Sequence, residues 1–451
     1  MLRLFLLLSS SLLLINCANN PFSSYKLKSD NILKSIYTQK NQTLPEIYGS
    51  SSNPDILFFM EYGTFLKLVN NYEQSNIQLN QAQLIIENWV NNWQNSISGK
   101  MLNTTIQLLI NDNITNYEPK GYEKTMLSTY KALNNINMGN SEFARIEIKR
   151  MYQIEQAIYN YNLVLYNKEK SKFDNIKSNS VESKLYQEIL HKYNFNDINT
   201  PEVLALKNSY QVAYAHYLAG FIFEALNEPS LSRPGYLKSG QLAPLNKLPR
   251  KSIDNLDNGT NHKNNYSNIL IIQEVGHAPQ IKSENLQFLF YTYVNEKICP
   301  TNINIFFPKL IPDKQGDIIY NYQIDGTNIQ QELFTNFDLM AARSMHDSMP
   351  HIIMRNISAA VKNISISSIS CNQGSLLLNL AGIVTSSLLD NADERSWVLL
   401  PSKVYLSRIQ LPFGKHNLQI NINGKIINQN ININKPYQII NMRIIGNNLY
   451  I

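Results

Sequence analysis

One set of residue spacings recurs three times in residues 53–240, a stretch with few Gly or Pro residues and no clear strand pattern. Counted from Gly63, Ala132 and Gly220, small residues stand at offsets 0 and 12, turn-forming residues at offset 7 and large residues at offset 16. Small residues are needed where two antiparallel helices pack closely. The spacing therefore predicts a helical repeat domain of roughly five to eight helices over residues 51–247.

The recurring offsets resemble the tetratricopeptide pattern, in which two helices meet at a small residue and are joined by a short turn. The third set departs from this pattern, because Pro229 stands within the expected turn or the early second helix. The starts of the sets are 69 and 88 residues apart (132 − 63 and 220 − 132), so further helices are expected between them. The other interpretation is a generic helical bundle. The resemblance implies a concave surface that binds a peptide or a partner protein.

The first 16 residues are typical of a secretion signal, with Arg3 at the start and an apolar run, Leu4–Ile15, that is too short to span a bilayer. The string from Leu14 to Cys17 resembles a bacterial lipobox, although Asn16 replaces the usual Gly, Ala or Ser. The resemblance implies that Cys17 is diacylated on its sulfur and becomes the first residue of the mature chain. The alternative is an ordinary signal peptide followed by an unrelated cysteine.

The residues after Cys17 indicate where the anchored chain would lie. Ala18 stands where an Asp would retain an enterobacterial lipoprotein at the inner membrane, so the outer membrane is favoured. Residues 17–50 are rich in Asn, Ser and Lys and predict a tether. We therefore expect a protein anchored through lipid to a membrane on its periplasmic side, with the outer membrane favoured over the inner.

Charge and composition limit the classes of partner. The chain has 451 residues, a net charge of +6 and only 16% charged residues, with no run of Lys and Arg. This pattern disfavours a nucleic-acid partner. Three Cys residues are too few for a disulfide-dense scaffold or a four-Cys zinc module.

The second half of the chain has a different pattern. Residues 248–267 break every periodicity and predict a linker. Residues 268–451 predict an α+β domain with a mainly antiparallel sheet, so the chain as a whole is expected to be a two-domain α+β protein. Strands are expected at 268–273, 288–294, 303–310, 318–324, 404–410 and 416–422, with turns at 411–414 and 423–424. Helices are expected at 337–346, interrupted at Pro350 and continuing to 362, and at 376–389.

Several stretches taken together resemble a poorly characterised bacterial lipoprotein family with a tetratricopeptide-like N-terminal half. They are the lipobox and residues 60–63 (MEYG), 71–75 (NYEQS), 121–127 (GYEKTML), 274–279 (EVGHAP), 392–397 (ADERSW) and 411–414 (LPFG). That family has no assigned reaction, so the resemblance implies an architecture and a location only. Some of its genes lie near those of penicillin-binding-protein activator lipoproteins, which implies a link to peptidoglycan synthesis.

The chain lacks the common catalytic, nucleotide-binding and metal-binding motifs, so we expect neither an enzyme nor a cofactor. His346 and His351 are five residues apart with Pro350 between them, which does not suit a helical pair of metal ligands. His277 follows a predicted buried strand. It is expected to be a turn residue whose ring bonds nearby backbone, and the alternative is a polar group at the mouth of a pocket.

Asp393, Arg395 and Trp397 stand close together in the sequence. An Asp and an Arg beside a Trp suggest an anion or sugar site as one interpretation. The structural interpretation is that Arg395 pairs with a carboxylate or with carbonyl groups, Trp397 packs in the core and Asp393 caps a turn. We expect the structural interpretation to hold.

Cys299 and Cys371 remain as cysteines in the mature chain once Cys17 carries lipid. A disulfide between them would close a loop of 72 residues (371 − 299) and stabilise the fold by about 4 kcal/mol in the chain-entropy model. The alternative is two buried thiols that do not meet.

These observations predict a lipid-anchored cell-envelope protein that acts as a non-enzymatic adaptor or scaffold and binds a protein partner through its helical repeats. The alternative is an envelope enzyme or ligand-binding receptor with a site in the C-terminal domain near His277, Asp393 and Arg395.

Overall fold

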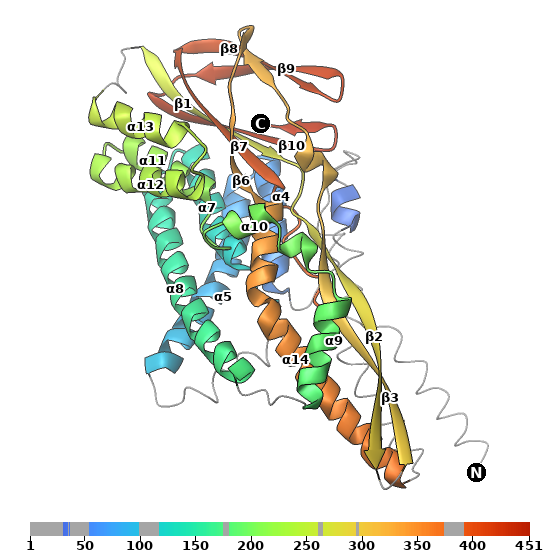
Figure 1. Cartoon of the computed structure of the whole chain (residues 1–451). Helices are drawn as coiled ribbons and strands as arrows, with labels where there is room; N and C mark the ends of the chain where they lie inside the picture. The colour runs from blue at the N-terminus through green and yellow to red at the C-terminus, as the bar shows by residue number, and fades with distance from the viewer. Residues whose placement is uncertain are drawn as a thin grey trace, which may run out of the picture.

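The computed structural model describes residues 30–34, 36, 54–98, 117–174, 180–259, 265–294, 297–373 and 392–451. It combines helices and sheets, so the predicted α+β class is confirmed. Figure 1 shows helices of the first half gathered beside the strands of the upper body. Helix α14 (Phe337–Gln373) extends away from this body beside a long hairpin of β2 (Gln280–Val294) and β3 (Lys297–Ile311) (Figure 1). We call α14, β2 and β3 the arm.

Three helix pairs follow the recurring spacing. They are α4 (Ile56–Leu68) with α5 (Tyr72–Ser98), α7 (Gly121–Asn137) with α8 (Ser141–Asp174), and α11 (Ala213–Ala225) with α12 (Pro229–Leu242). In each turn the residue at offset 7 has a positive φ: 60° at Asn70, 79° at Gly139 and 59° at Asn227. Gly and Asn tolerate this left-handed conformation better than other residues, which explains their place at the helix C-termini.

The small residues at offsets 0 and 12 lie where the paired helices approach each other. The Ser75 hydroxyl donates to the Gly63 carbonyl at 2.6 Å, and the Ser232 hydroxyl donates to the Gly220 carbonyl at 2.7 Å. A Cβ on Gly63 would come within 2.5 Å of the Leu79 side chain at offset 16. The recurring residues therefore have equivalent contacts in the first and third pairs.

The predicted linker at 248–267 is wrong over its first half, because residues 248–257 form α13 (Leu248–Asp257). Pro249 stands in the first turn, where its missing N–H has no helical partner to lose. Ile253 is buried on the same face, and the hydroxyls of Ser252 and Tyr217 lie 2.6 Å apart. Packing against α11 and α12 makes this short polar segment a helix.

The predicted tether at 17–50 is also wrong in part. Residues 30–34 and 36 are helical, and Ile32, Leu33 and Ile36 are buried in the main core. Asn448, near the end of the chain, donates from its side chain to the Ile36 carbonyl at 2.8 Å. The three apolar residues share one helical face, which explains their burial.

Helix α14 continues through Pro350, so the predicted interruption there is wrong. A proline within a helix removes one backbone hydrogen bond. Here Met345, Met349 and Ile353 are buried on both sides of the proline, against the hairpin of the arm and helix α9 (Val181–Lys192). Packing along the whole buried face of α14 outweighs the free-energy cost of the hydrogen bond that Pro350 removes. The predicted helix at 376–389 lies outside the described residues.

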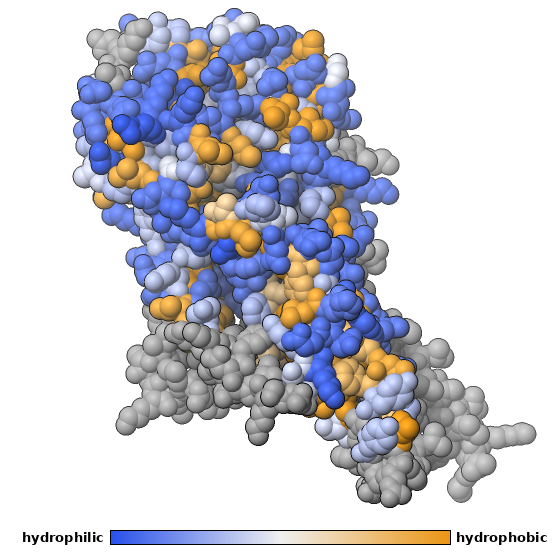
Figure 2. Space-filling model, viewed as in Figure 1, coloured by the Kyte–Doolittle hydropathy of each residue, from blue (hydrophilic) through white to orange (hydrophobic). Residues whose placement is uncertain are grey.

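Two short elements connect α9 to α11. These are a 3₁₀ helix (Asn196–Ile198) and α10 (Pro201–Ala205). Leu185 and Ile189 of α9 and Val203 of α10 are buried in the same cluster as the inner face of α14. Apolar side chains also reach the surface of the arm, where Leu289 is 52% exposed and Ile298 is 57% exposed. Figure 2 shows apolar residues among hydrophilic ones on the visible face of both arm and body.

The strands of the described residues form two sheets besides the arm. The five-stranded sheet has the order β11 (Asn448–Tyr450), β10 (Tyr437–Ile445), β1 (Tyr266–Val275), β7 (Lys403–Pro412) and β6 (Glu332–Asn336). The four-stranded sheet has the order β5 (Thr327–Asn328), β4 (Tyr322–Ile324), β8 (Gly414–Ile422) and β9 (Lys425–Ile433). Strands β1 and β10 are parallel, whereas the other described pairings are antiparallel. The predicted mainly antiparallel sheet is therefore confirmed.

Most of the predicted strands are present with longer bounds. The strand expected at 318–324 is wrong at its start, because β4 begins only at Tyr322 after a 3₁₀ turn, Lys314–Asp317, which Asp313 caps. The turn expected at 423–424 joins β8 to β9, with positive φ at Asn423 and Gly424. The turn expected at 411–414 is wrong in extent, because β7 runs to Pro412 and β8 begins at Gly414. Only Phe413 lies between the two strands, where the chain passes from one sheet to the other.

The body has three layers, which are the helices, the five-stranded sheet and the four-stranded sheet. Strand β1 lies in the middle layer and is buried on both faces. Leu270 and Ile272 belong to the core shared with the helices, whereas Ile269 and Ile271 belong to the core between the two sheets. Alternate residues of a strand point to opposite faces, which produces this division. The main core contains residues from both sides of the predicted boundary at 248–267. That boundary therefore separates helical from strand-rich sequence, while the core is continuous across it.

Within these ranges no helix combines the length and the apolar character needed to cross a bilayer.

Candidate functional site

His277 lies in the turn after β1, as the sequence predicted. Its ring Nδ1 lies 2.7 Å from the Ala278 carbonyl oxygen, and its backbone N–H donates to Asp313 Oδ2 at 2.9 Å. Gly276, with φ of +66°, makes the turn possible. The expected contact of the ring with nearby backbone is present.

Asp393 and Arg395 bind each other. Arg395 Nε and Nη2 each donate to an Asp393 carboxylate oxygen at 2.9 Å, and the Arg395 backbone N–H also donates to Asp393. Burial alone would raise the pKa of Asp393, but the hydrogen bonds and charge of Arg395 outweigh it and hold that pKa below its ordinary value. The Arg395 guanidinium also lies over the Tyr117 ring, with its carbon 5.5 Å from the ring centroid. The pairing with a carboxylate is the one expected from the sequence.

Trp397 is fully buried, and the segment around it joins the sheet to the helices. Its indole N–H donates to Thr64 at 3.0 Å, and its backbone N–H donates to Glu123 at 3.0 Å. Glu61 accepts the backbone N–H groups of Val398 at 2.7 Å and Leu399 at 3.1 Å. Two buried carboxylates from α4 and α7 thus hold three consecutive backbone N–H groups.

A buried ion pair lies in the same contact region. Lys67 Nζ of α4 lies 3.6 Å from Glu274 Oε2 of β1, with both side chains at most 3% exposed. Burial lowers the pKa of Lys67, and the Glu274 carboxylate partly opposes this shift. The stretches 60–63, 121–127, 274–279 and 392–397, which carry the family resemblance, therefore all contribute to the contact between helices and sheet. The main contacts of these stretches hold the helices against the sheet.

The cysteines and the remaining histidines give less information. Cys299 is disulfide-bonded and buried in β3. Cys371 lies in α14, but its side chain is outside the described residues, so the pairing of the two stays a prediction. Cys17 also lies outside the described residues. His346 contacts Asp347 at 3.3 Å, and among the side chains described no group of three or more His, Cys, Asp and Glu residues could hold a metal ion.

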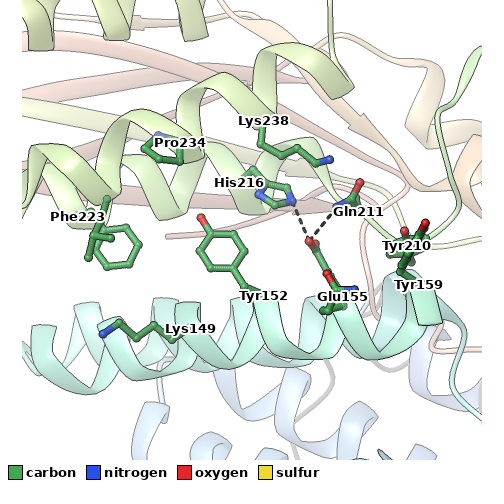
Figure 3. A pocket seen from close by; sticks show the side chains of 12 residues that line it. Lys149, Tyr152, Glu155, Tyr159, Tyr210, Gln211, His216, Phe223, Pro234 and Lys238 are labelled. Atoms are coloured by element: carbon green, nitrogen blue, oxygen red, sulfur yellow. Dashed lines mark hydrogen bonds and ion pairs between the residues drawn. The ribbon is translucent and has the colours of Figure 1, made fainter. Parts of the chain in front are cut away.

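A cavity of about 700 Å³ lies in the helical half, between α8 and the α11–α12 pair. We call it the groove. One wall comes from α8, and the other comes from α11, α12 and the segment before α11 that contains Tyr210 and Gln211 (Figure 3). The lining residues are Lys149, Tyr152, Glu155, Gln156, Tyr159, Tyr210, Gln211, His216, Phe223, Leu231, Pro234 and Lys238. Those from α8 recur every three or four residues, so they share one helical face.

Two buried polar side chains face each other at the floor of the groove. His216 Nε2 lies 3.1 Å from Glu155 Oε2 without the geometry of a hydrogen bond. The His216 ring stacks on Tyr152, with centroids 5.5 Å apart, and the Gln211 amide donates to Glu155 Oε2 at 3.3 Å (Figure 3). Glu155 Oε1 and His216 Nδ1 have no hydrogen-bond partner among the described residues. Such atoms are costly when buried, and they can bind a ligand group that completes their hydrogen bonds.

Tyrosines and lysines surround this floor. Burial and the Glu155 carboxylate raise the pKa of Tyr152, so its phenol stays protonated and neutral at ordinary pH. Tyr159 is 51% exposed, which opens the groove to solvent at one side. Lys149 and Lys238 stand on opposite walls (Figure 3).

None of the side chains named as candidates in the sequence lines the groove. Glu155 and His216 are 61 residues apart in the chain, and no motif contains them. The signal available was indirect, because the recurring spacing predicted the helices that form both walls.

No protein-family model, curated protein or solved structure matches the chain.

Proposed function

We propose that this protein is a lipid-anchored adaptor of the cell envelope that binds a segment of a partner protein in the groove. The observation that carries the proposal is the groove itself, formed by two of the three helix pairs and containing unsatisfied polar atoms on its floor. Its volume is within the usual range for binding sites, and its aromatic rim suits protein contacts.

The equivalent turns and close contacts of the helix pairs support a tetratricopeptide-like origin for the helical half. The link to peptidoglycan synthesis is part of the proposal through the family resemblance alone. The alternative of an enzyme or receptor site near His277, Asp393 and Arg395 has less support, because those polar groups bind one another or nearby backbone.

The anchor at Cys17 is proposed from the lipobox-like string before it. The wild-type protein should incorporate labelled palmitate, and Cys17→Ser should not. Equal labelling of both proteins would contradict lipidation at this residue.

The adaptor proposal is tested by filling the groove. Gln156 lines the groove on α8, whereas Gln153 is exposed on the same helix and does not line it. We expect Gln156→Trp to lose most of the partner recovered by affinity purification from crosslinked envelopes, because the indole occupies the space that the partner needs.

Gln153→Trp is the matched control and should recover as much partner as the wild type. Equal recovery with both variants, at equal protein levels, would contradict binding in the groove.

A further inference from the structure

We propose that the segment bound in the groove is an extended, acidic peptide, with its main chain over Glu155 and His216 and its carboxylates at Lys149 and Lys238. This inference rests on the proposed function, because it names the chemistry of the partner at the same site.

The floor offers the groups that a peptide unit needs. A backbone amide presents one N–H donor and one carbonyl acceptor within the same unit. Glu155 Oε1 is an acceptor without a donor, and His216 has ring nitrogens without hydrogen-bond partners among the described residues. Both side chains are at most 5% exposed, so the groove is their route to a ligand. The Glu155 carboxylate accepts the peptide N–H, and a His216 ring N–H donates to the peptide carbonyl.

The orientation of the floor is fixed by its neighbours. Asn208 and Gln211 are joined at 2.8 Å between their side chains, and Gln211 in turn donates to Glu155. Stacking on Tyr152 limits rotation of the His216 ring. A preorganised pair loses less side-chain entropy when the ligand binds.

The charge on the two walls selects an acidic segment. In the part of the chain that the structure describes, no ion pair involves Lys149 or Lys238, although both line the groove. The neighbouring cations of α8 are already paired, since Arg145 lies 3.0 Å from Glu228 and Arg150 lies 2.6 Å from Glu147. The two lysines are therefore available to bind carboxylates of a ligand.

The far end of the groove is apolar. Phe223 and Pro234 line it from α11 and α12, and Lys149 lies opposite them on α8 (Figure 3). An apolar side chain of the segment fits there, between the main-chain contact and the carboxylate at Lys149. The expected ligand thus alternates acidic and apolar residues.

Two fluorescein-labelled peptides test the charge selection, measured by fluorescence anisotropy with the purified full chain. One has three alternating Leu and Ala residues between two Asp residues, and the other has Asn in place of each Asp. We expect the Asp peptide to bind about tenfold more tightly, from two ion pairs at partly exposed lysines. The double variant Lys149→Gln/Lys238→Gln should abolish this preference.

The matched control is Lys415→Gln/Lys425→Gln, which removes the same charge from exposed positions on β8 and β9. It should retain the preference. Absence of binding, equal binding of both peptides or an equal loss in the control would overturn the proposal.

N-methylation of single amides in the Asp peptide tests the main-chain contact. Methylation at one position should weaken binding about tenfold, because it removes the N–H whose hydrogen bond Glu155 accepts. Glu155→Gln should reduce that loss of affinity. If no position matters, the main-chain contact is wrong.

If Gln156→Trp releases the partner but the two peptides bind alike, the adaptor function stands and the acidic ligand does not.

Discussion

Replacing Glu61 with alanine is expected to lower the free energy of unfolding by about 3–5 kcal/mol. Glu61 is fully buried on α4, and its carboxylate accepts the backbone N–H groups of Val398 and Leu399. Alanine would leave both donors without this partner in a dry interior and would leave a cavity beside Trp397. The loss should weaken the contact between the helices and the sheet.

Urea unfolding followed by circular dichroism measures this loss. Glu61→Gln keeps one carbonyl oxygen as an acceptor and should lose less stability than Glu61→Ala. Glu188→Ala, at an exposed position of α9, should leave the free energy of unfolding almost unchanged. Equal stability of Glu61→Ala and Glu188→Ala would show that the carboxylate does not hold the segment.

Removing Arg408 should have an effect of similar size. Arg408 of β7 pairs with Glu224 of α11, and the two side chains are 6% and 3% exposed. Tyr236 donates to the same carboxylate at 2.6 Å. Arg408→Met would leave Glu224 buried without its cation, which costs about 3–5 kcal/mol of stability.

Two further variants separate the pair from the general effect of losing an arginine. The double variant Glu224→Leu/Arg408→Met should be more stable than Arg408→Met alone, because no unpaired charge remains buried. Arg250→Met, at an 85% exposed side chain, should change stability little. If Arg408→Met unfolds at the same urea concentration as the wild type, the buried pair does not join helix to sheet.

The helix pairs could be predicted because their determinants are local. The turn residues at Asn70, Gly139 and Asn227 adopt the conformation that Gly and Asn favour, and the recurring small residues fit the close contact between two helices. Strand positions could be predicted for the same reason, since runs such as 268–273 combine apolar character with short length.

The errors arise where packing between distant segments decides local structure. Pro350 interrupts the sequence pattern of α14, but the buried face on both sides keeps the helix continuous. Residues 30–34, 36 and 248–257 lack strong signals of their own, and they become helical against surfaces that other elements supply.

The groove could not be predicted from the sequence for a related reason. Glu155 and His216 meet only because α11 packs beside α8, and neither residue belongs to a motif. Glu61 likewise reaches Val398 across 337 residues of chain. Side chains that are unremarkable in the sequence gain a role once the fold places them together.

Site-specific photo-crosslinking tests the adaptor proposal most directly. A photoreactive phenylalanine analogue is placed at Tyr159, which lines the groove. The control carries the same analogue at Tyr166, which lies on the same helix but does not line the groove. Both positions are exposed, at 51% and 65%. We predict that Tyr159 captures a partner in cells, that Tyr166 does not, and that mass spectrometry places the crosslink in one segment of that partner. Capture of the same proteins from both positions, or from neither, would contradict an adaptor that binds its partner in the groove.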